Sequence, residues 1–206
     1  MSDVLVVGLT GGLATGKTTI AEIFNTLGAI IIDADKVARE IVKPNSSTWQ
    51  ELTEYFGTKI LNDDLTINRK LLSDLVFSNE TYRIKLNEIT HPTIIQRIKE
   101  EIEKLRSSGK AKIVIIDAPL LIEAKMASMV DRLIVVTASE ITQIKRVMKR
   151  DNLSPDAAKN KINSQMPLSE KVKLADFVID TDCQKTELKE KVIKIWDKLT
   201  LVTGNW

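Results

Sequence analysis

The sequence predicts an α/β fold in which a five-stranded parallel sheet carries helices on both faces. Five short apolar runs each end in a polar or glycine-rich turn, and helical spacing of apolar residues follows most of them. Strands that alternate with helices favour right-handed crossovers, and hence a parallel sheet. The five runs are residues 4–10, 29–32, 113–116, 133–136 and 177–179. In such sheets ligands bind beyond the carboxyl ends of the strands.

The helices are predicted from apolar residues at intervals of three and four. Residues 17–27 show this spacing, and Gly28 is suited to end that helix. Similar patterns lie around 139–150 and 186–199. Each follows an apolar run, as a crossover helix does.

Two regions do not share this alternation. Residues 35–108 have helical patterns without a buried strand; Asn68 is suited to cap one helix, and His91-Pro92 is expected to interrupt the next. Residues 151–170 are polar, contain two prolines and are expected to form a mobile flap. The predicted organisation is a core of 1–34, 109–150 and 171–206 that contains the sheet, a helical subdomain of 35–108, and a flap or lid of 151–170.

Composition narrows the class of protein. The 206 residues are 43% hydrophobic and 28% charged, and the net charge is only +2. A clustered basic excess, which is usual in nucleic-acid-binding modules, is lacking. Cys183 is the single cysteine, and no run approaches the ~20 apolar residues of a membrane span. We therefore expect a cytoplasmic protein, monomeric or weakly homo-oligomeric, with neither a membrane nor a nucleic acid as partner.

The segment after the first apolar run matches the phosphate-loop pattern G-x-x-x-x-G-K-[ST]. Such a loop wraps a phosphate with backbone N–H groups, and the following helix adds its positive N-terminal end. Lys17 is expected to span the β- and γ-phosphates of ATP, and the Thr18 hydroxyl to ligate Mg²⁺. The residues predicted to bind ATP are Gly11, Gly12, Leu13, Ala14, Thr15, Gly16, Lys17, Thr18 and Thr19.

Carboxylates at strand ends supply candidate catalytic groups. Asp33 follows the second run and is predicted to be the general base that accepts the proton of the acceptor hydroxyl. Asp35 is the rival for that role, and we assign it to the N-cap of the next helix. Asp117 ends the third run and is predicted to hold Mg²⁺, with a turn-forming role as the alternative. Glu123 could also face the site.

Arg146 and Arg150 are four residues apart on the helix predicted after Thr137, so they share a face. An arginine near the cleft can stabilise charge on the transferring phosphoryl group, and we predict this catalytic role for Arg146. The alternative is that both arginines are solvated surface residues. A polar hinged segment after this helix suits a lid that excludes water.

Together these stretches resemble the dephospho-CoA kinase family. The resemblance is carried by GLTGGLATGKTT at 8–19, LGAIIIDADKVAREIV at 27–42, HP at 91–92, IIDAPLLIE at 115–123, QIKRVMKRD at 143–151, and SQMPLSEK with ADFVID within 164–180. It implies a phosphotransferase that uses ATP and Mg²⁺ to phosphorylate the ribose 3′-hydroxyl of dephospho-CoA.

The same resemblance implies roles for individual residues. The residue that matches Asp33 is the family's base, and the one that matches Arg146 contacts phosphates. Residues 35–108 would take the CoA moiety, and the candidates to meet its pyrophosphate are Arg39, Arg69, Arg83 and Arg97.

Two positions depart from the family pattern. Ala14 stands where the family usually has glycine, so the loop backbone must accept a Cβ there. Lys161 stands where lids of the family commonly have arginine. Lysine keeps the charge but lacks the planar fork, so we do not expect it to make a bidentate contact to ATP.

Other enzymes and switches share the core. A shikimate kinase also has an aspartate after its second strand, but it uses a further glycine triplet, and this chain has no Gly-Gly outside the phosphate loop. A regulatory GTPase would need N-K-x-D after a strand; the nearest match, residues 160–163, lacks the aspartate. Both are weaker interpretations than the dephospho-CoA kinase.

Overall fold

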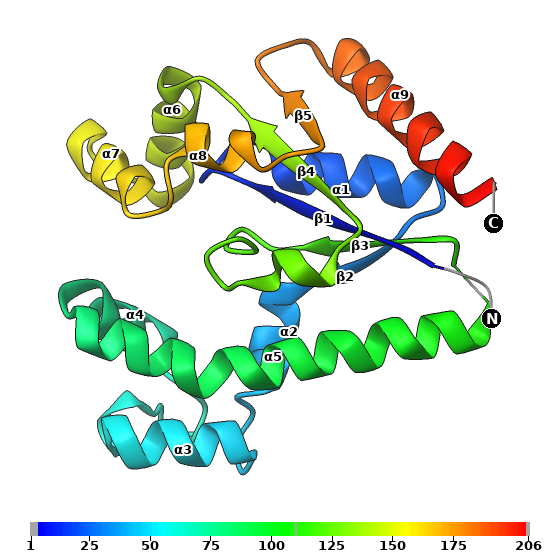
Figure 1. The fold of residues 1–206 in the computed structure, drawn as a ribbon. Coiled ribbons are helices and arrows are strands. Elements are labelled where there is room, and N and C mark those ends of the chain that lie inside the picture. The colour runs from blue at the N-terminus through cyan, green and yellow to red at the C-terminus, as the bar shows by residue number, and fades with distance from the viewer. Residues whose placement is uncertain (1–3, 110, 205–206) are drawn as a thin grey trace. The chain divides into compact units, whose positions relative to one another are not determined.

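A computed structural model describes residues 4–109 and 111–204 (Figure 1). Its centre is a five-stranded parallel sheet with the strand order β2-β3-β1-β4-β5. The strands are β1 (Leu5–Gly11), β2 (Ile30–Asp33), β3 (Ile113–Asp117), β4 (Arg132–Thr137) and β5 (Phe177–Asp180). The predicted fold class and all five predicted strands are confirmed.

Strand β1 is the middle of the sheet, and all seven of its residues are buried. It pairs in parallel with β3, where Leu9 lies beside Asp117, and with β4, where Gly11 lies beside Val136. A continuous apolar run is the sequence pattern of a strand that is covered on both faces. The register therefore brings the carboxyl ends of β1, β3 and β4 to one edge of the sheet.

One face of the sheet is covered by α1 (Lys17–Thr26) and α9 (Lys185–Gly204), which lie side by side (Figure 1). Alternate residues of β1 point toward these helices, so Val7 and Leu9 join Phe24 and Val192 in one apolar core. This core anchors α1, the helix that begins at the phosphate loop.

The opposite face is covered by the segment between β3 and β4 and by α8 (Leu168–Lys173). That segment contains a 3₁₀ helix, η2 (Met126–Met129). A Cβ on Gly8 would lie 2.9 Å from a methyl carbon of Leu121, so the segment packs directly on the sheet.

Two aspartates fasten the starts of neighbouring strands in the same way. Asp131 precedes β4: its carboxylate accepts from Val6 N at 2.8 Å, and its own N–H donates to Val6 O. Asp176 precedes β5 and repeats the arrangement with Leu133. The paired bonds set the register of β1, β4 and β5 at the edge remote from the phosphate loop.

The segment predicted to be a polar flap is largely helical. α6 (Glu140–Asp151) leads into α7 (Pro155–Asn163), and a short turn then leads into α8. Ser139 and Ser154 cap α6 and α7 with their hydroxyls, and Pro155 takes the first turn, where its missing N–H costs nothing. Serine and proline therefore start helices here.

By contact density the chain divides into two compact units, residues 1–32 with 104–206, and residues 33–103. The second unit contains α2 (Ala34–Glu40), α3 (Ser47–Phe56), η1 (Thr58–Ile60), α4 (Arg69–Ser78) and most of α5 (Glu80–Ser108). Its only extended pairing is a single bridge between Leu61 and Ile67, and every residue of 33–103 is described. The expectation of a helical region without a strand is confirmed.

This helical unit has an apolar core of its own. Leu52, Phe56 and Leu72 are buried together, and Tyr82 packs edge-on against Phe56 at 5.6 Å between ring centroids. Asn68 caps α4 as predicted, because its Oδ1 accepts from Leu71 N at 3.0 Å.

The expected interruption at His91-Pro92 is wrong, because α5 continues through Pro92. Proline removes one backbone N–H and crowds the carbonyl four residues earlier, which disfavours a helix interior. Here Ile89 is buried before the proline and Ile98 after it, so packing holds the helix together on both sides. Burial also lowers the pKa of His91.

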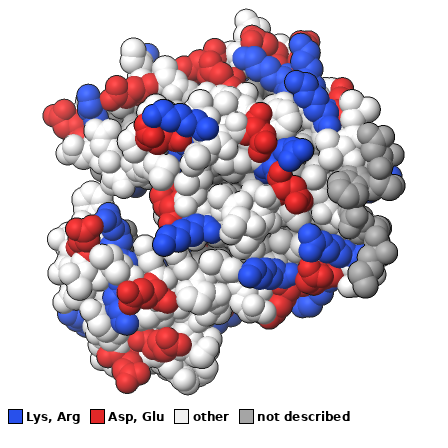
Figure 2. All heavy atoms as spheres, viewed as in Figure 1, with Lys and Arg blue, Asp and Glu red and all other residues white. Residues whose placement is uncertain are grey.

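Charges of both signs are interspersed on the face that Figure 2 shows. The arrangement agrees with the small net charge of the sequence. None of the helices in the described residues has the length and apolar character needed to cross a bilayer.

Candidate active site

The phosphate loop lies between β1 and α1, at the carboxyl edge of the sheet. Gly16 precedes α1 with a φ of +90°, a left-handed conformation that glycine adopts without strain. Gly11 is required for a different reason: a Cβ there would lie 2.6 Å from the Val136 carbonyl oxygen of β4. The two glycines of the motif therefore meet different requirements: Gly16 allows a left-handed turn, and Gly11 allows the backbone of β4 to come close.

The loop's carbonyl oxygens are held by side chains from two other elements. Thr181, just after β5, donates from Oγ1 to Thr15 O at 2.7 Å. Arg146 of α6 donates from Nη1 to Ala14 O and to Thr181 Oγ1, each at 3.1 Å. In a trans peptide the C=O and the following N–H point in opposite directions. The bond to Thr15 O therefore turns the Gly16 N–H to the opposite side, as an anion-binding loop requires.

Lys17 and Asp117 form an ion pair. Both side chains are mostly buried, and Asp117 reaches the loop because β3 is the parallel neighbour of β1. The structure therefore brings together the lysine predicted to bind phosphate and the carboxylate predicted to hold Mg²⁺. Arg146, the third predicted residue, contacts the same loop.

The donor set at this edge suits a magnesium ion that is shared with a nucleotide. Thr18 supplies a hydroxyl at the start of α1, and Asp117 supplies a carboxylate. Both are hard oxygen donors, and Mg²⁺ is usually held by one or two protein groups plus substrate phosphates. In the described part of the chain no group of three or more His, Cys, Asp or Glu could form an all-protein metal cage.

The N-cap of α2 is Asp33 and not Asp35. Asp33 ends β2 and is itself the N-cap of α2, because its Oδ1 accepts from Lys36 N at 3.0 Å. Asp35 lies in the first turn of α2, so its expected capping role is wrong. The helix begins one residue after the strand, which leaves Asp33 as the only residue in the cap position. β2 also neighbours β3 rather than β1 in the sheet.

Of the four arginines proposed to meet the acceptor's pyrophosphate, two are already paired. Arg83 binds Glu80 at 3.0 Å, and Arg97 binds Glu100 at 3.3 Å, both on the exposed surface of α5. Arg69 and Arg39 differ from them. Burial lowers the pKa of Arg69, and the nearby positive charge of Arg39 lowers it further, while Asp35 raises it.

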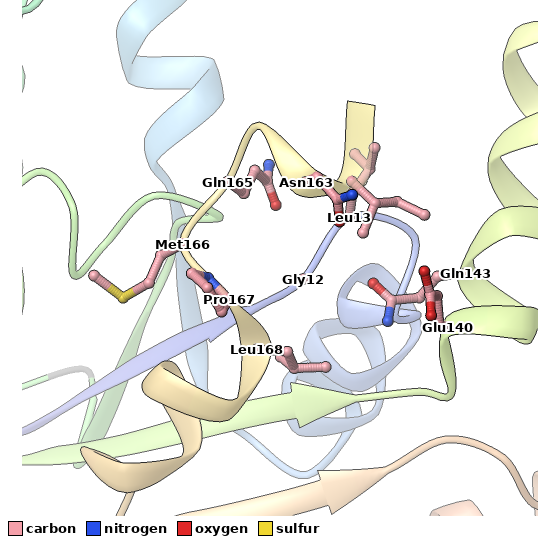
Figure 3. A pocket seen from close by; sticks show the side chains of 10 residues that line it. Gly12, Leu13, Glu140, Gln143, Asn163, Gln165, Met166, Pro167 and Leu168 are labelled. Atoms are coloured by element: carbon pink, nitrogen blue, oxygen red, sulfur yellow. The ribbon is translucent and has the colours of Figure 1, made fainter. Parts of the chain in front are cut away.

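A cavity of about 390 Å³ lies between the phosphate loop and the lid (Figure 3). Gly12 and Leu13 of the loop line one side, Glu140 and Gln143 of α6 another. Residues 162–163 and 165–168, at the end of the lid, complete the wall. The turn between α7 and α8 thus shares a cavity wall with the phosphate loop.

The lysine that departs from the family lid pattern is paired within the lid. Lys161 Nζ lies 2.8 Å from Asp151 Oδ2, and Arg150 binds the same carboxylate with two nitrogens. Hydrogen bonds from Arg150 and then Lys161 hold the pKa of Asp151 well below its usual range. Arg150 therefore has a structural partner, whereas Arg146 reaches the loop.

Sequence reasoning missed three residues at this site. Thr181 is buried beneath the loop, and Gln143 is buried beside Gly12, donating to Ala138 O at 2.9 Å. Lys171 is fully buried next to the segment that follows Asp117. A polar residue directly after a buried strand was the available signal for Thr181, but nothing local distinguishes Lys171 from a solvated lysine.

A phosphate loop at the carboxyl edge of a parallel sheet, with a lysine and an aspartate that meet beside it, defines a P-loop phosphotransferase. The family model for dephospho-CoA kinase matches residues 5–187. The chain belongs to the dephospho-CoA kinase family, whose members use ATP as substrate.

Individual proteins agree with this assignment. The dephospho-CoA kinase of Carboxydothermus hydrogenoformans is 45% identical over 193 residues, which cover 94% of this chain and 93% of that protein. The solved structure of dephospho-CoA kinase from Campylobacter jejuni is 32% identical, with a TM-score of 0.71 and 98% of each chain covered. A shikimate kinase from Bacteroides thetaiotaomicron is 14% identical with a TM-score of 0.54, covering 95% of this chain and 98% of its own, a likeness of fold alone.

The conformation of Ala14 leads to a stability prediction. Its φ of +59° is left-handed, a conformation that glycine adopts without strain. We expect Ala14→Gly to raise the free energy of unfolding by about 1 kcal/mol, because glycine removes the Cβ strain. Ala157→Gly, in helical α7, is the matched control and should lower it by ~0.5–1 kcal/mol. Urea denaturation compares them, and equal losses in both variants would contradict a strained Ala14.

Proposed function

We propose that this protein transfers the γ-phosphoryl group of ATP to the ribose 3′-hydroxyl of dephospho-CoA, giving CoA and ADP in the last step of coenzyme A biosynthesis. The observation that carries the proposal is the meeting of Lys17 and Asp117 beside the phosphate loop, in a chain of the dephospho-CoA kinase family. We assign the reaction to the cytoplasm.

The phosphate loop and Lys17 are proposed to bind the phosphates of ATP. Backbone N–H groups of residues 11–19 and the N-terminal end of α1 provide a positive cradle for the β- and γ-phosphates. Lys17 adds a compact charge that can follow the γ-phosphoryl group during transfer. Thr181 and Arg146 keep the cradle in shape by binding its carbonyl oxygens.

Mg²⁺ would be held by the Thr18 hydroxyl and by Asp117, directly or through water. When bound, the ion supplies positive charge that neutralises the phosphate oxygens. Asp117 lies on the strand next to β1, so its backbone is fixed by the sheet. Thr18 lies in the first turn of α1 and is fixed by that helix.

Asp33 is the proposed general base. The cap bond uses Oδ1 and thereby fixes the orientation of the carboxylate, while Oδ2 is a second acceptor on the same group. A carboxylate at the carboxyl end of a parallel strand lies at the edge where such folds bind ligands. It can accept the proton of the 3′-hydroxyl as the new O–P bond forms.

Arg146 is proposed to contribute charge to the transition state from beneath the loop. Its guanidinium bonds two loop-side oxygens through Nη1, so it is held in place before substrate arrives. A cation fixed in advance stabilises developing charge without further reorganisation. The lid, residues 151–170, is proposed to exclude water, since its end lines the cavity beside Gly12 and Leu13.

The helical unit of 33–103 is proposed to bind the CoA moiety. Within it, Arg39 and Arg69 are the arginines whose charges act on each other, and Asp35 offsets them in part. Two guanidinium groups held close together favour a doubly charged group such as a pyrophosphate. Arg83 and Arg97 already have carboxylate partners on α5.

A comparison of acceptors tests the activity itself. With ATP and Mg²⁺ in a coupled ADP assay, we expect turnover with dephospho-CoA and little with shikimate, AMP or water. An acceptor kinase selects by contacts to the whole substrate, so kcat/KM should differ by about 10³ or more. Equal turnover with shikimate would remove the proposed acceptor and favour the alternative kinase.

Asp33→Asn tests the base. Asparagine caps a helix as well as aspartate does, so the start of α2 should be retained. We expect kcat to fall by ~10²–10⁴, the usual effect of losing a general base, while ATP affinity changes little. Asp35→Asn, two residues on in the same turn, is the matched control and should keep its kcat. Steady-state kinetics decide, and full turnover in Asp33→Asn would exclude the role.

Arg69→Gln tests the acceptor site. We expect KM for dephospho-CoA to rise about tenfold, the loss of ~1.4 kcal/mol that one charge-assisted contact contributes, with KM for ATP unchanged. Arg97→Gln removes an equal charge from an exposed ion pair on α5 and should leave both constants near wild type. If the two variants behave alike, the effect is one of net charge and not of this site.

A further inference from the structure

A lysine that looks like a surface residue in the sequence is one of the most buried side chains of the protein. Lys171 lies on α8, directly after the lid, and none of its side chain is exposed. Its neighbours in sequence, Glu170 and Lys173, pair with each other on the exposed side of the same helix. Lys171 is the one buried residue of α8, all of which is described.

The ammonium group binds the backbone that follows the metal-site carboxylate. Lys171 Nζ donates to the carbonyl oxygen of Pro119 at 2.8 Å. Thr10, the last residue before the phosphate loop, donates to the same oxygen at 3.0 Å. Ala118, the residue between Asp117 and Pro119, donates its backbone N–H to Leu9 O at 3.0 Å. Residues 117–119 are therefore fastened to β1 and to α8 within two residues of Asp117.

The same lysine is connected to the end of the lid through a carboxylate. Lys171 Nζ lies 2.8 Å from Glu123 Oε1, which also accepts from Met166 N at 3.4 Å. The other oxygen, Glu123 Oε2, is buried and has no hydrogen-bond partner among the described residues. Lys171 is thus the main compensation for the charge of Glu123.

Stability alone does not account for this pair. Removing two charges from water is costly, and well-packed apolar residues of similar size often replace a buried ion pair with no loss of stability. What the apolar pair cannot supply is a hydrogen bond to the Pro119 carbonyl. The useful property of Lys171 is therefore the position that it imposes on this backbone.

We propose that Lys171, held by Glu123, is a positioning residue for phosphoryl transfer: it fixes the backbone of residues 117–119, and so Asp117, to the C-terminal end of the lid. The inference rests on the role proposed above for Asp117. It also gives a function to Glu123 and to the lysine of the SQMPLSEK stretch, which the phosphate site itself leaves unused.

The test compares Lys171→Met with Lys171→Met/Glu123→Leu, which removes both charges. We expect the single variant to unfold at lower temperature, since Glu123 is left uncompensated, and the double variant to regain thermal stability. In both, kcat should fall about 10- to 100-fold with KM for ATP nearly unchanged, the usual cost of a small misplacement. Amide hydrogen exchange of residues 118–124 should remain faster than in wild type.

A double variant that regains wild-type kcat together with its stability would overturn the proposal, because the pair would then serve packing alone. Thr10→Val covers the case in which the Lys171 variants do not fold. It removes the other donor to Pro119 O at little change of shape, and should lower kcat severalfold and speed the same amide exchange. If Thr10→Val speeds this exchange yet keeps wild-type kcat, the position of residues 117–119 does not affect transfer, and the proposal is overturned. If neither changes, Lys171 by itself holds the Pro119 carbonyl, as the proposal requires.

Asp117→Asn, measured in parallel, separates this inference from the function on which it rests. If it loses activity while the double variant does not, the role of Asp117 stands and that of Lys171 fails. If Asp117→Asn keeps full activity, the proposed role of Asp117 fails, and positioning through it fails as well. A loss of kcat in both supports the proposal.

Discussion

The site depends on one set of interactions, the hydrogen bonds that side chains outside the phosphate loop donate to the loop's carbonyl oxygens. Thr181 binds the carbonyl of Thr15, and Arg146 binds that of Ala14. A flexible loop would have to be ordered when its ligand binds, which costs conformational entropy. These hydrogen bonds fix the loop conformation beforehand and so reduce that cost. The bonds come from β5 and α6, so the shape of the loop depends on the completed sheet. The glycines that the loop needs are part of the local sequence motif, whereas the hydrogen bonds that hold the loop in shape come from the tertiary structure.

These hydrogen bonds also explain which site residues can be predicted from the sequence and which cannot. The glycines, Lys17 and Thr18 stand in a local pattern whose spacing is set by the loop itself, and Asp117 follows from strand order, because parallel neighbours end at one edge. The contacts of Arg146 and Thr181 with the loop do not follow from a local pattern, since their partners are 132 and 166 residues away. Such contacts depend on helix register and strand position, which residue type does not encode.

The incorrect expectations have different causes. Asp33 and not Asp35 caps α2, because the helix starts immediately after β2 and leaves Asp33 in the cap position. Pro92 was expected to break α5, but buried isoleucines on either side hold the helix. Lys171 has no local sequence feature that indicates burial, yet none of its side chain is exposed. At Pro92 and at Lys171, tertiary packing overrides a local preference.

The strand pairing also bears on how the chain folds as it is synthesised. β1 is made first, yet Leu5 pairs with Ile113 and Val7 with Arg132, both in the second half of the chain. Its apolar residues therefore have no strand partners until residues 113–117 and 132–136 have been synthesised. Contacts between residues so distant in sequence form slowly, and until they form the apolar strand segments stay exposed and prone to aggregate. The helical unit of 33–103, whose contacts are local, can form during that interval on the ribosome.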